Sequence, residues 1–160
     1  MTIVADASPL IALAQIGRLD LLLILFTDLL IPPAILDEIS RTNKPYSTEL
    51  VKFATPFVKQ IQNTDRVLEL CQIVDRGEAE AIALALENLP TNLLIDERKG
   101  RRIAIEHGLS IIGSIGILLR AKQMGQIEAI KPYLDHWMST DYRIGAKLYL
   151  RGLSLANELN

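Results

Sequence analysis

The sequence predicts an α/β fold, in which helices cover both faces of a central parallel sheet. Short apolar runs alternate with segments of helical periodicity along most of the 160 residues. Two runs, at residues 3–5 and 93–95, are apolar throughout, which is typical of parallel strands buried on both faces. Each run is followed at once by an aspartate, Asp6 or Asp96. Because ligands of open α/β sheets bind beyond the carboxyl ends of the strands, these aspartates are candidate site residues.

The elements of the N-terminal half are indicated by their apolar spacing and their end signals. Ser8 is expected to cap the first helix, with Pro9 in its first helical position and Gly17 at its end. Pro32 and Pro33 open a later helix. The expected elements are a strand at 2–6, a helix from the Ser8 cap to Gly17, a helix at 18–26, a strand at 28–31, helices at 34–41 and from 47, and a strand at 57–61.

The C-terminal half continues the alternation of strands and helices. The expected elements are helices near 65–73 and 77–89, a strand at 92–96, a helix at 98–107, a strand at 109–112 and a helix at 114–124. Residues 127–160 are expected to form a helical C-terminal region. No linker, charge block or repeat divides the chain, so we expect a single domain over residues 1–160.

Composition narrows the class of protein. The net charge of −2 argues against a generally basic nucleic-acid-binding protein but leaves room for a local basic patch. The single cysteine, Cys71, excludes an internal disulfide and is expected to be a buried structural residue. The most apolar stretch, at residues 19–31, is too short to span a bilayer. Because no signal-like segment follows Met1, we expect a cytoplasmic protein.

Helical geometry selects two further carboxylates. In the 34–41 helix, Glu38 shares a face with Ile35 and Ile39, so it is expected to point inward, whereas Asp37 is rotated toward water. In the 77–89 helix, Glu78 lies on the apolar stripe at the helix start, where the helix dipole favours an anion. The same helical spacing turns Glu80 away from the apolar stripe, so Glu80 is expected to be solvated.

Each of these acids has an ordinary alternative role as a helix cap, a dipole partner or a residue at the rim of the core. Their combination favours one pocket, formed by Asp6, Glu38, Glu78 and Asp96. Carboxylates held close together are costly unless a cation lies between them. Oxygen ligands without a His or Cys cluster favour Mg²⁺ or Mn²⁺ over Zn²⁺.

The densest basic cluster of the chain, at residues 98–102, follows Asp96 almost directly. One interpretation is a solvated helix face paired with acids such as Glu97 and Glu106. The other is that the cluster holds substrate phosphates beside a metal ion. The residues assigned to that role are Arg98, Lys99 and Arg102.

Short segments along residues 1–131 share their order and spacing with a known family. They are IVADASPLI at 3–11, ILDEI at 35–39, GEAEAI at 77–82, LID at 94–96 and RIA at 102–104, with GL at 108–109 and GSIG at 113–116. These segments resemble a PIN domain, and most closely its VapC-like toxin and nucleic-acid-binding branch. The resemblance implies a PIN-like, Rossmann-like three-layer sandwich. It also implies an acidic quartet that holds Mg²⁺ or Mn²⁺ and hydrolyses RNA.

Carried over by position, that quartet falls on Asp6, Glu38, Glu78 and Asp96. The third position is often Asp in the family and is Glu here, and the nearby Glu80 is its alternative. Asp6 and Asp96 would be the primary ligands, because strand ends hold them rigidly. The two glutamates would complete the shell directly or through water, and one of them would accept the proton of the attacking water. The hydroxyls of Ser8 and Ser114 would add contacts to water or substrate.

We therefore expect a metal-dependent endoribonuclease, the toxin of a toxin–antitoxin pair. The resemblance implies a homodimer and an inhibitory antitoxin protein that covers the acidic pocket. The alternatives are a PIN-like module that binds nucleic acid or protein without turnover, and a small-molecule metal hydrolase. The C-terminal leucines either pack on the core or form an intermolecular surface; they are Leu148, Leu150, Leu153, Leu155 and Leu159.

Overall fold

The computed structural model describes residues 1–140, 142 and 144–159. In this part of the chain, β1 (Thr2–Ala5), β2 (Asp28–Leu30), β3 (Thr91–Leu94) and β4 (Ser110–Ile112) form one sheet in the order β2-β1-β3-β4. Every neighbouring pair is parallel. β2 lies on one side of β1, and β3 and β4 lie on the other side. The strand order therefore reverses between β1 and β3, which is where such sheets bind ligands.

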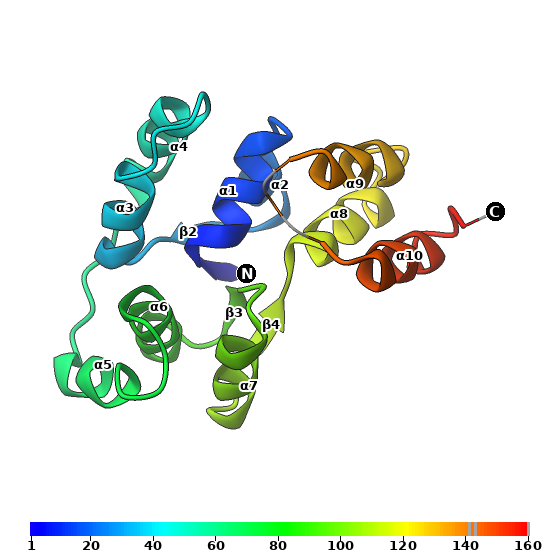
Figure 1. Ribbon diagram of the computed structural model, residues 1–160. Coiled ribbons are helices and arrows are strands. Elements are labelled where there is room, and N and C mark those ends of the chain that lie inside the picture. The colour runs from blue at the N-terminus through cyan, green and yellow to red at the C-terminus, as the bar shows by residue number, and fades with distance from the viewer. Residues whose placement is uncertain (141, 143, 160) are drawn as a thin grey trace.

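Helices connect the strands and cover both faces of the sheet (Figure 1). They are α1 (Ala7–Gln15), α2 (Asp20–Leu25), α3 (Pro33–Ser40), α4 (Ser47–Ala54), α5 (Thr64–Leu70), α6 (Arg76–Glu87), α7 (Arg98–Glu106), α8 (Ser114–Gln123), α9 (Lys131–Met138) and α10 (Ala146–Leu155), with a 3-10 turn η1 at Thr55–Phe57.

Alternate side chains of β1 enter two different apolar clusters. Ile3 and Ala5 pack with buried residues of α1, α2, α8 and α9, whereas Val4 packs with buried residues of α5, α6 and α7. This alternation follows from the pleat of a strand buried on both sides. It confirms the predicted three-layer α/β sandwich with a central parallel sheet.

The start of α1 differs from the sequence prediction. The N-cap position is Asp6, with extended backbone angles, and Ser8 lies exposed within the first turn; the predicted cap at Ser8 is therefore wrong. β1 passes into α1 without an intervening loop, so only the residue after the strand is free to take the extended conformation. At the other end, Gly17 adopts a left-handed φ of 66°, as a helix-ending glycine does.

Two smaller predictions also change. The strand expected at 57–61 is wrong, because η1 covers its first residue and only Val58 forms an isolated parallel bridge, to Ile31. Cys71 is half-buried beside the second apolar cluster rather than enclosed in it. Within the described residues, no helix combines the length and apolar character that crossing a membrane requires.

The C-terminal region is helical, as predicted, with residues 141, 143 and 160 outside the described part. Trp137 of α9 is fully buried and donates its indole N–H to the carbonyl oxygen of Ala12 at 2.8 Å. In α10 Leu153 is buried, but the other four leucines of the predicted apolar set are exposed. The region therefore packs on the core through α9 and one face of α10 and leaves apolar side chains on the surface.

Candidate metal site at the carboxyl ends of the strands

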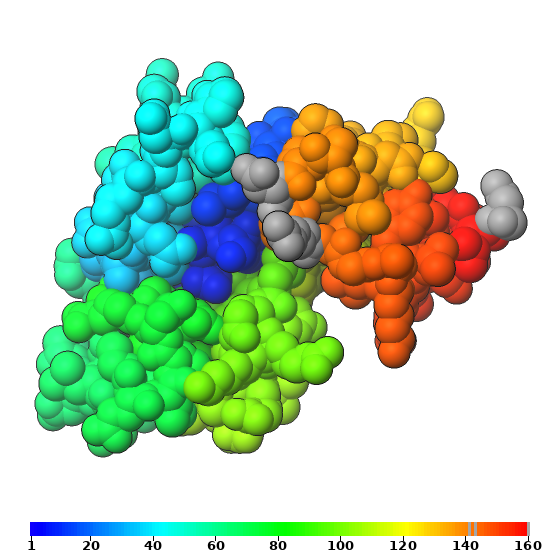
Figure 2. Space-filling model, viewed as in Figure 1, coloured from blue at the N-terminus to red at the C-terminus, as the bar shows by residue number. Residues whose placement is uncertain are grey.

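Asp6 and Asp96 follow the two central strands of the sheet. β1 and β3 pair in register with Ala5 opposite Leu94, and the Asp6 N–H donates to the Leu94 carbonyl at 3.0 Å. Asp96 comes two residues after β3 ends. Both aspartates therefore lie at the carboxyl edge where the strand order reverses. In Figure 2 the blue surface of the first helix lies between the cyan, green and orange parts of the molecule.

Asp6 is buried, with 7% of its surface exposed. Burial is the main cause that raises the pKa of its carboxyl group to about 7, and the charges of Glu38, Asp75 and Asp96 act in the same direction. A hydrogen bond from the backbone N–H of Ala7 opposes the shift. An ionised Asp6 is therefore costly unless a positive charge compensates it.

The Asp96 carboxylate is held by donors from two distant segments. The Ser114 N–H, at the start of α8, donates to Oδ1 at 2.8 Å, and the Ser114 hydroxyl donates to Oδ2. The Tyr142 hydroxyl donates to Oδ2 at 2.6 Å. Ser114 is fully buried, and its hydroxyl contacts Asp96 rather than facing the groove. Three donors thus fix the orientation of this carboxylate.

Glu38 reaches the same region from α3. The residue is exposed, so the prediction that it points inward is wrong. A Cβ placed on Gly77 would come within 3.3 Å of the Glu38 Oε1, which shows how closely α3 approaches the start of α6. Burial and then the charge of Asp75 raise the pKa of Glu38, while Arg41 lowers it.

Glu78 is the most strongly perturbed acid of the site. Only 8% of its surface is exposed, and its Oε2 has no hydrogen-bond partner among the described residues. Burial, followed by the carboxylates of Asp75, Asp6 and Glu97, raises the pKa of Glu78 to about 9. A buried carboxylate oxygen without a partner is rare, because it loses its hydration and gains nothing in return.

Glu80 is buried, so the prediction that it is solvated is wrong. Its Oε1 accepts from the Ala34 N–H at 3.0 Å, and its Oε2 pairs with the Nε of Arg76 at 2.8 Å. Glu80 thus caps α3, whose first-turn N–H groups lack helical partners. Because both oxygens are occupied and α3 takes up the side chain, Glu78 remains the third member of the predicted quartet.

Two further acids belong to this region: Asp75, which the sequence did not single out, and Glu97, which was considered only as a partner of the basic cluster. Asp75 caps α6 by accepting from the Glu78 N–H at 2.8 Å, and Glu97 caps α7 by accepting from the Gly100 N–H at 2.7 Å. That bond from Gly100 is the main cause that lowers the pKa of Glu97. For Asp75 a sequence signal exists, because an Asp three residues before a Glu at a helix start is a capping pattern.

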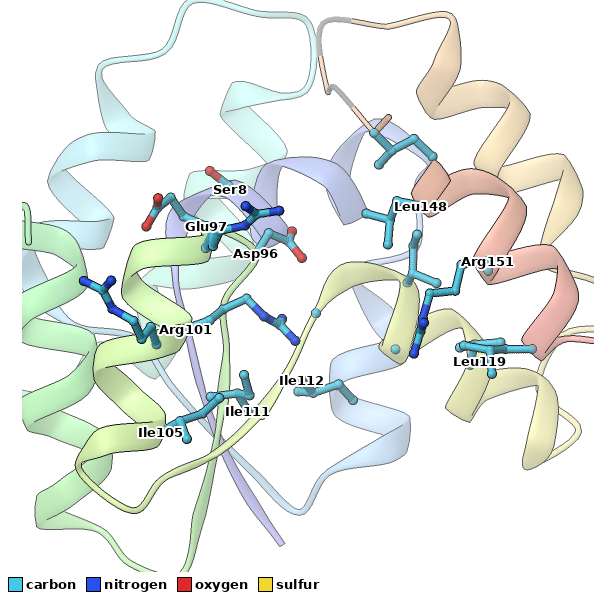
Figure 3. Close-up of a pocket in the computed structure, with 18 of the residues that line it drawn as sticks. Ser8, Asp96, Glu97, Arg101, Ile105, Ile111, Ile112, Leu119, Leu148 and Arg151 are labelled. Atoms are coloured by element: carbon cyan, nitrogen blue, oxygen red, sulfur yellow. The ribbon is translucent and has the colours of Figure 1, made fainter. Parts of the chain in front are cut away.

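A groove of about 1100 Å³ begins at Asp96 and runs between α7, α8 and α10 (Figure 3). Arg98, Arg101 and Arg102 line it from α7, and Arg151 lines it from α10. Many of the other side chains that line the groove are apolar, including Ile105, Ile112, Leu119, Leu148 and Leu155. Of the predicted substrate residues, Ser8, Arg98 and Arg102 line the groove, whereas Lys99 does not and Ser114 contacts Asp96 instead.

The side chains of the basic cluster make three different kinds of contact. Arg101 donates to the Ile95 carbonyl at 2.7 Å, so it supports the segment that carries Asp96. Arg102 lies 3.9 Å from Glu106 on an exposed face, as in the solvated interpretation. No described residue pairs with Arg98, which leaves this guanidinium available to an anion.

The carboxylates perturb one another, but they are not arranged as a finished ligand shell. Among the described residues, no three His, Cys, Asp or Glu side chains converge closely enough to hold a metal ion. Two observations nevertheless fit a hard cation. The donors are all oxygens, and the unpartnered Oε2 of Glu78 lies among acids whose pKa values burial raises.

A family model described as a PIN domain matches residues 2–158. The chain belongs to the PIN-domain family. No curated protein and no solved structure matches the chain significantly. PIN domains are in general nucleases and typically use divalent metal ions, so the family indicates nuclease-type chemistry. The match extends well beyond the segments that suggested the resemblance and includes α9 and α10.

Proposed function

We propose that this PIN domain is a metal-dependent endoribonuclease that hydrolyses RNA phosphodiester bonds. The observation that carries the proposal is the buried Glu78 carboxylate, whose Oε2 has no partner and whose neighbours are other acids. In the metal-free protein the raised pKa keeps this group protonated near neutral pH, and a bound cation would stabilise its ionised form. Its place beside Asp6, at the carboxyl edge of the sheet, is where a parallel sheet binds its ligand.

Asp6, Glu38, Glu78 and Asp96 would hold Mg²⁺ or Mn²⁺. A bound divalent ion supplies a water of lowered pKa and stabilises negative charge on the phosphate oxygens. Glu38 is the member of the quartet that is open to solvent, so it would accept the proton of an attacking water. Ser114 holds Asp96 in one orientation, and Arg98 at the entrance of the groove offers a guanidinium to a phosphate.

The proposal is tested by cleavage of labelled single-stranded RNA by protein freed of metal with EDTA. Cleavage should appear on adding Mn²⁺ or Mg²⁺, and Asp6→Asn or Asp96→Asn should lower its rate by at least about 100-fold. The matched control is Asp37→Asn, because Asp37 is an exposed acid on the same helix as Glu38. It should cleave like the wild type.

The same assay identifies the third acid. Glu78→Gln should abolish cleavage, whereas Glu80→Gln should retain it, because the amide oxygen can still accept from Ala34. The reverse pattern would contradict the assignment of Glu78. Cleavage that persists in EDTA would contradict the metal dependence. Tight RNA binding without any cleavage would instead support a PIN-like binding module.

We also propose that the protein is the toxin of a toxin–antitoxin pair, acts as a homodimer and is inhibited by a small protein. The apolar groove beside Asp96 supports a protein partner, because Ile105, Leu148 and Leu155 expose 58%, 48% and 60% of their surfaces. Large exposed apolar side chains gathered in a groove are typical of interaction sites. No described residue pairs with Arg151, which would meet acidic groups of the partner.

Co-expression with any small protein that is encoded beside this gene tests the partner. We expect a stable complex in which RNA cleavage is suppressed, and light scattering should show a dimer of the free protein. Arg151→Glu should weaken the complex, whereas Lys147→Glu should not, because Lys147 lies on α10 outside the groove. A monomer that binds no such neighbour and does not slow growth would contradict the toxin role.

A further inference from the structure

Tyr142 joins the C-terminal region to a residue of the candidate metal site. Its hydroxyl donates to the Asp96 Oδ2 at 2.6 Å, across 46 positions of the chain. The Ser114 hydroxyl donates to the same carboxylate oxygen. Asp96 is thus oriented from both α8 and the segment between α9 and α10.

The Tyr142 side chain is itself held by the core. Its ring packs against that of Trp137, with centroids 5.1 Å apart and planes inclined by 57°. Trp137 is fully buried and is anchored by its bond to the Ala12 carbonyl. The Tyr142 N–H also donates to the Thr140 hydroxyl at 3.2 Å. Because the Tyr142 hydroxyl is held rigidly by these contacts, it can fix the orientation of the Asp96 carboxylate.

We propose that Tyr142 is a positioning residue for the metal site: it sets the orientation in which Asp96 offers its remaining lone pair to a cation. This inference rests on the proposed metal dependence and extends it to the C-terminal region. A carboxylate has about four lone-pair sites, and the three donors at Asp96 leave about one for a ligand. Loss of one donor lets the group rotate.

Residues that orient metal ligands by hydrogen bonds contribute strongly to metal affinity. Removing such a partner typically lowers metal affinity by about 10-fold to 100-fold. Tyr142→Phe removes only the hydroxyl and keeps the ring on Trp137, so the C-terminal region should remain packed. We therefore expect the variant to bind Mg²⁺ at least about tenfold more weakly than the wild type.

The test is calorimetric titration of the metal-free, full-length protein with Mg²⁺, paired with the fluorescence of Trp137, which is the only tryptophan of the chain. Binding should change the fluorescence of the wild type, because Tyr142 connects the Trp137 ring to Asp96. In Tyr142→Phe the affinity should fall and the metal-induced fluorescence change should shrink. Both readouts are independent of RNA cleavage.

Tyr149→Phe is the matched control, because it removes another C-terminal hydroxyl, bonded to the exposed Asp135 away from the site. It should bind Mg²⁺ like the wild type. Affinity of Tyr142→Phe within twofold of the wild type, or equal weakening in both variants, would overturn the inference. So would tighter binding, or a fluorescence change of the same size in Tyr142→Phe and the wild type. A wild type that binds no Mg²⁺ would overturn the proposed function together with it.

Discussion

The ionisation of Glu78 makes the stability of the metal-free protein depend on pH. Its pKa is about 9 in the folded protein, against an ordinary value of 4.5. Between these values the folded state binds more protons than the unfolded state, so the free energy of unfolding should fall as the pH rises. Asp6 adds to the fall between its ordinary 3.8 and about 7. Stability should therefore be highest at low pH within this window and lowest near its upper end.

Urea unfolding in EDTA, at pH values across that interval, measures the effect. Glu78→Gln cannot ionise, so its stability should fall much less with rising pH than that of the wild type. Saturating Mg²⁺ should stabilise the wild type most at the alkaline end, where the acids are charged. A wild-type free energy of unfolding that is flat or rises across the interval would contradict the electrostatic account of the site.

Single residues also show where sequence reasoning reaches its limit. The strand-end rule placed Asp6 and Asp96 on one edge, because that inference needs only local patterns. The helical wheel put Glu80 in water because it considers α6 alone, whereas α3 packs against α6 and takes Glu80 as its cap. Tyr142 carries no local signal, since its contact with Asp96 depends on how the C-terminal region folds back.

At the scale of the elements, glycines let helix starts approach the acids. Gly100 lies in the first turn of α7, and a Cβ there would overlap the Glu78 Oε2 and come within 2.6 Å of the Ile95 Cδ1. Gly77 likewise faces Ile35 and the Glu38 carboxylate. Glu78 lies close to Glu97 because α6 and α7 begin near one another. The sequence predicted both helices within a few residues but could not predict this approach.

Gly100→Ala should weaken Mg²⁺ binding by displacing Glu78. Alanine favours a helix by about 1 kcal/mol over glycine, but overpacking costs about 1–3 kcal/mol, so we expect a net loss of stability. Gly145→Ala is the control, because a Cβ placed there would meet no atom of the described residues within 4 Å, apart from its chain neighbours. Calorimetry and urea unfolding measure the two effects. Equal Mg²⁺ affinities of Gly100→Ala and the wild type would show that the site tolerates a wider gap between α6 and α7.

At the scale of the whole molecule, the C-terminal region belongs to the same packed unit as the sheet. Buried residues of α8, α9 and α10 share one apolar cluster with Ile3 and Ala5 of β1. Figure 1 shows α9 and α10 beside α8 rather than apart from the rest. The helical character of this region was predicted, but its contacts were not, because they join residues more than a hundred positions apart, as Trp137 and Ala12 do.

Trp137 should therefore contribute strongly to stability. Trp137→Ala should lower the free energy of unfolding by about 3–5 kcal/mol, the usual cost of removing a large buried aromatic side chain. The exposed Met138 offers a neighbouring control, and Met138→Ala should have little effect. Urea unfolding followed by circular dichroism measures both. A loss below about 1 kcal/mol for Trp137→Ala would mean that α9 is only loosely attached to the core.

The central claim is that four acids, each from a different part of the chain, form one metal centre. Calorimetric titration with Mn²⁺ tests it most directly, because it needs neither the RNA target nor the protein partner. The wild type should bind Mn²⁺, and binding should be weakened strongly in each of Asp6→Asn, Glu38→Gln, Glu78→Gln and Asp96→Asn, while Asp37→Asn binds normally. Wild-type affinity in two or more of the four variants would contradict the account.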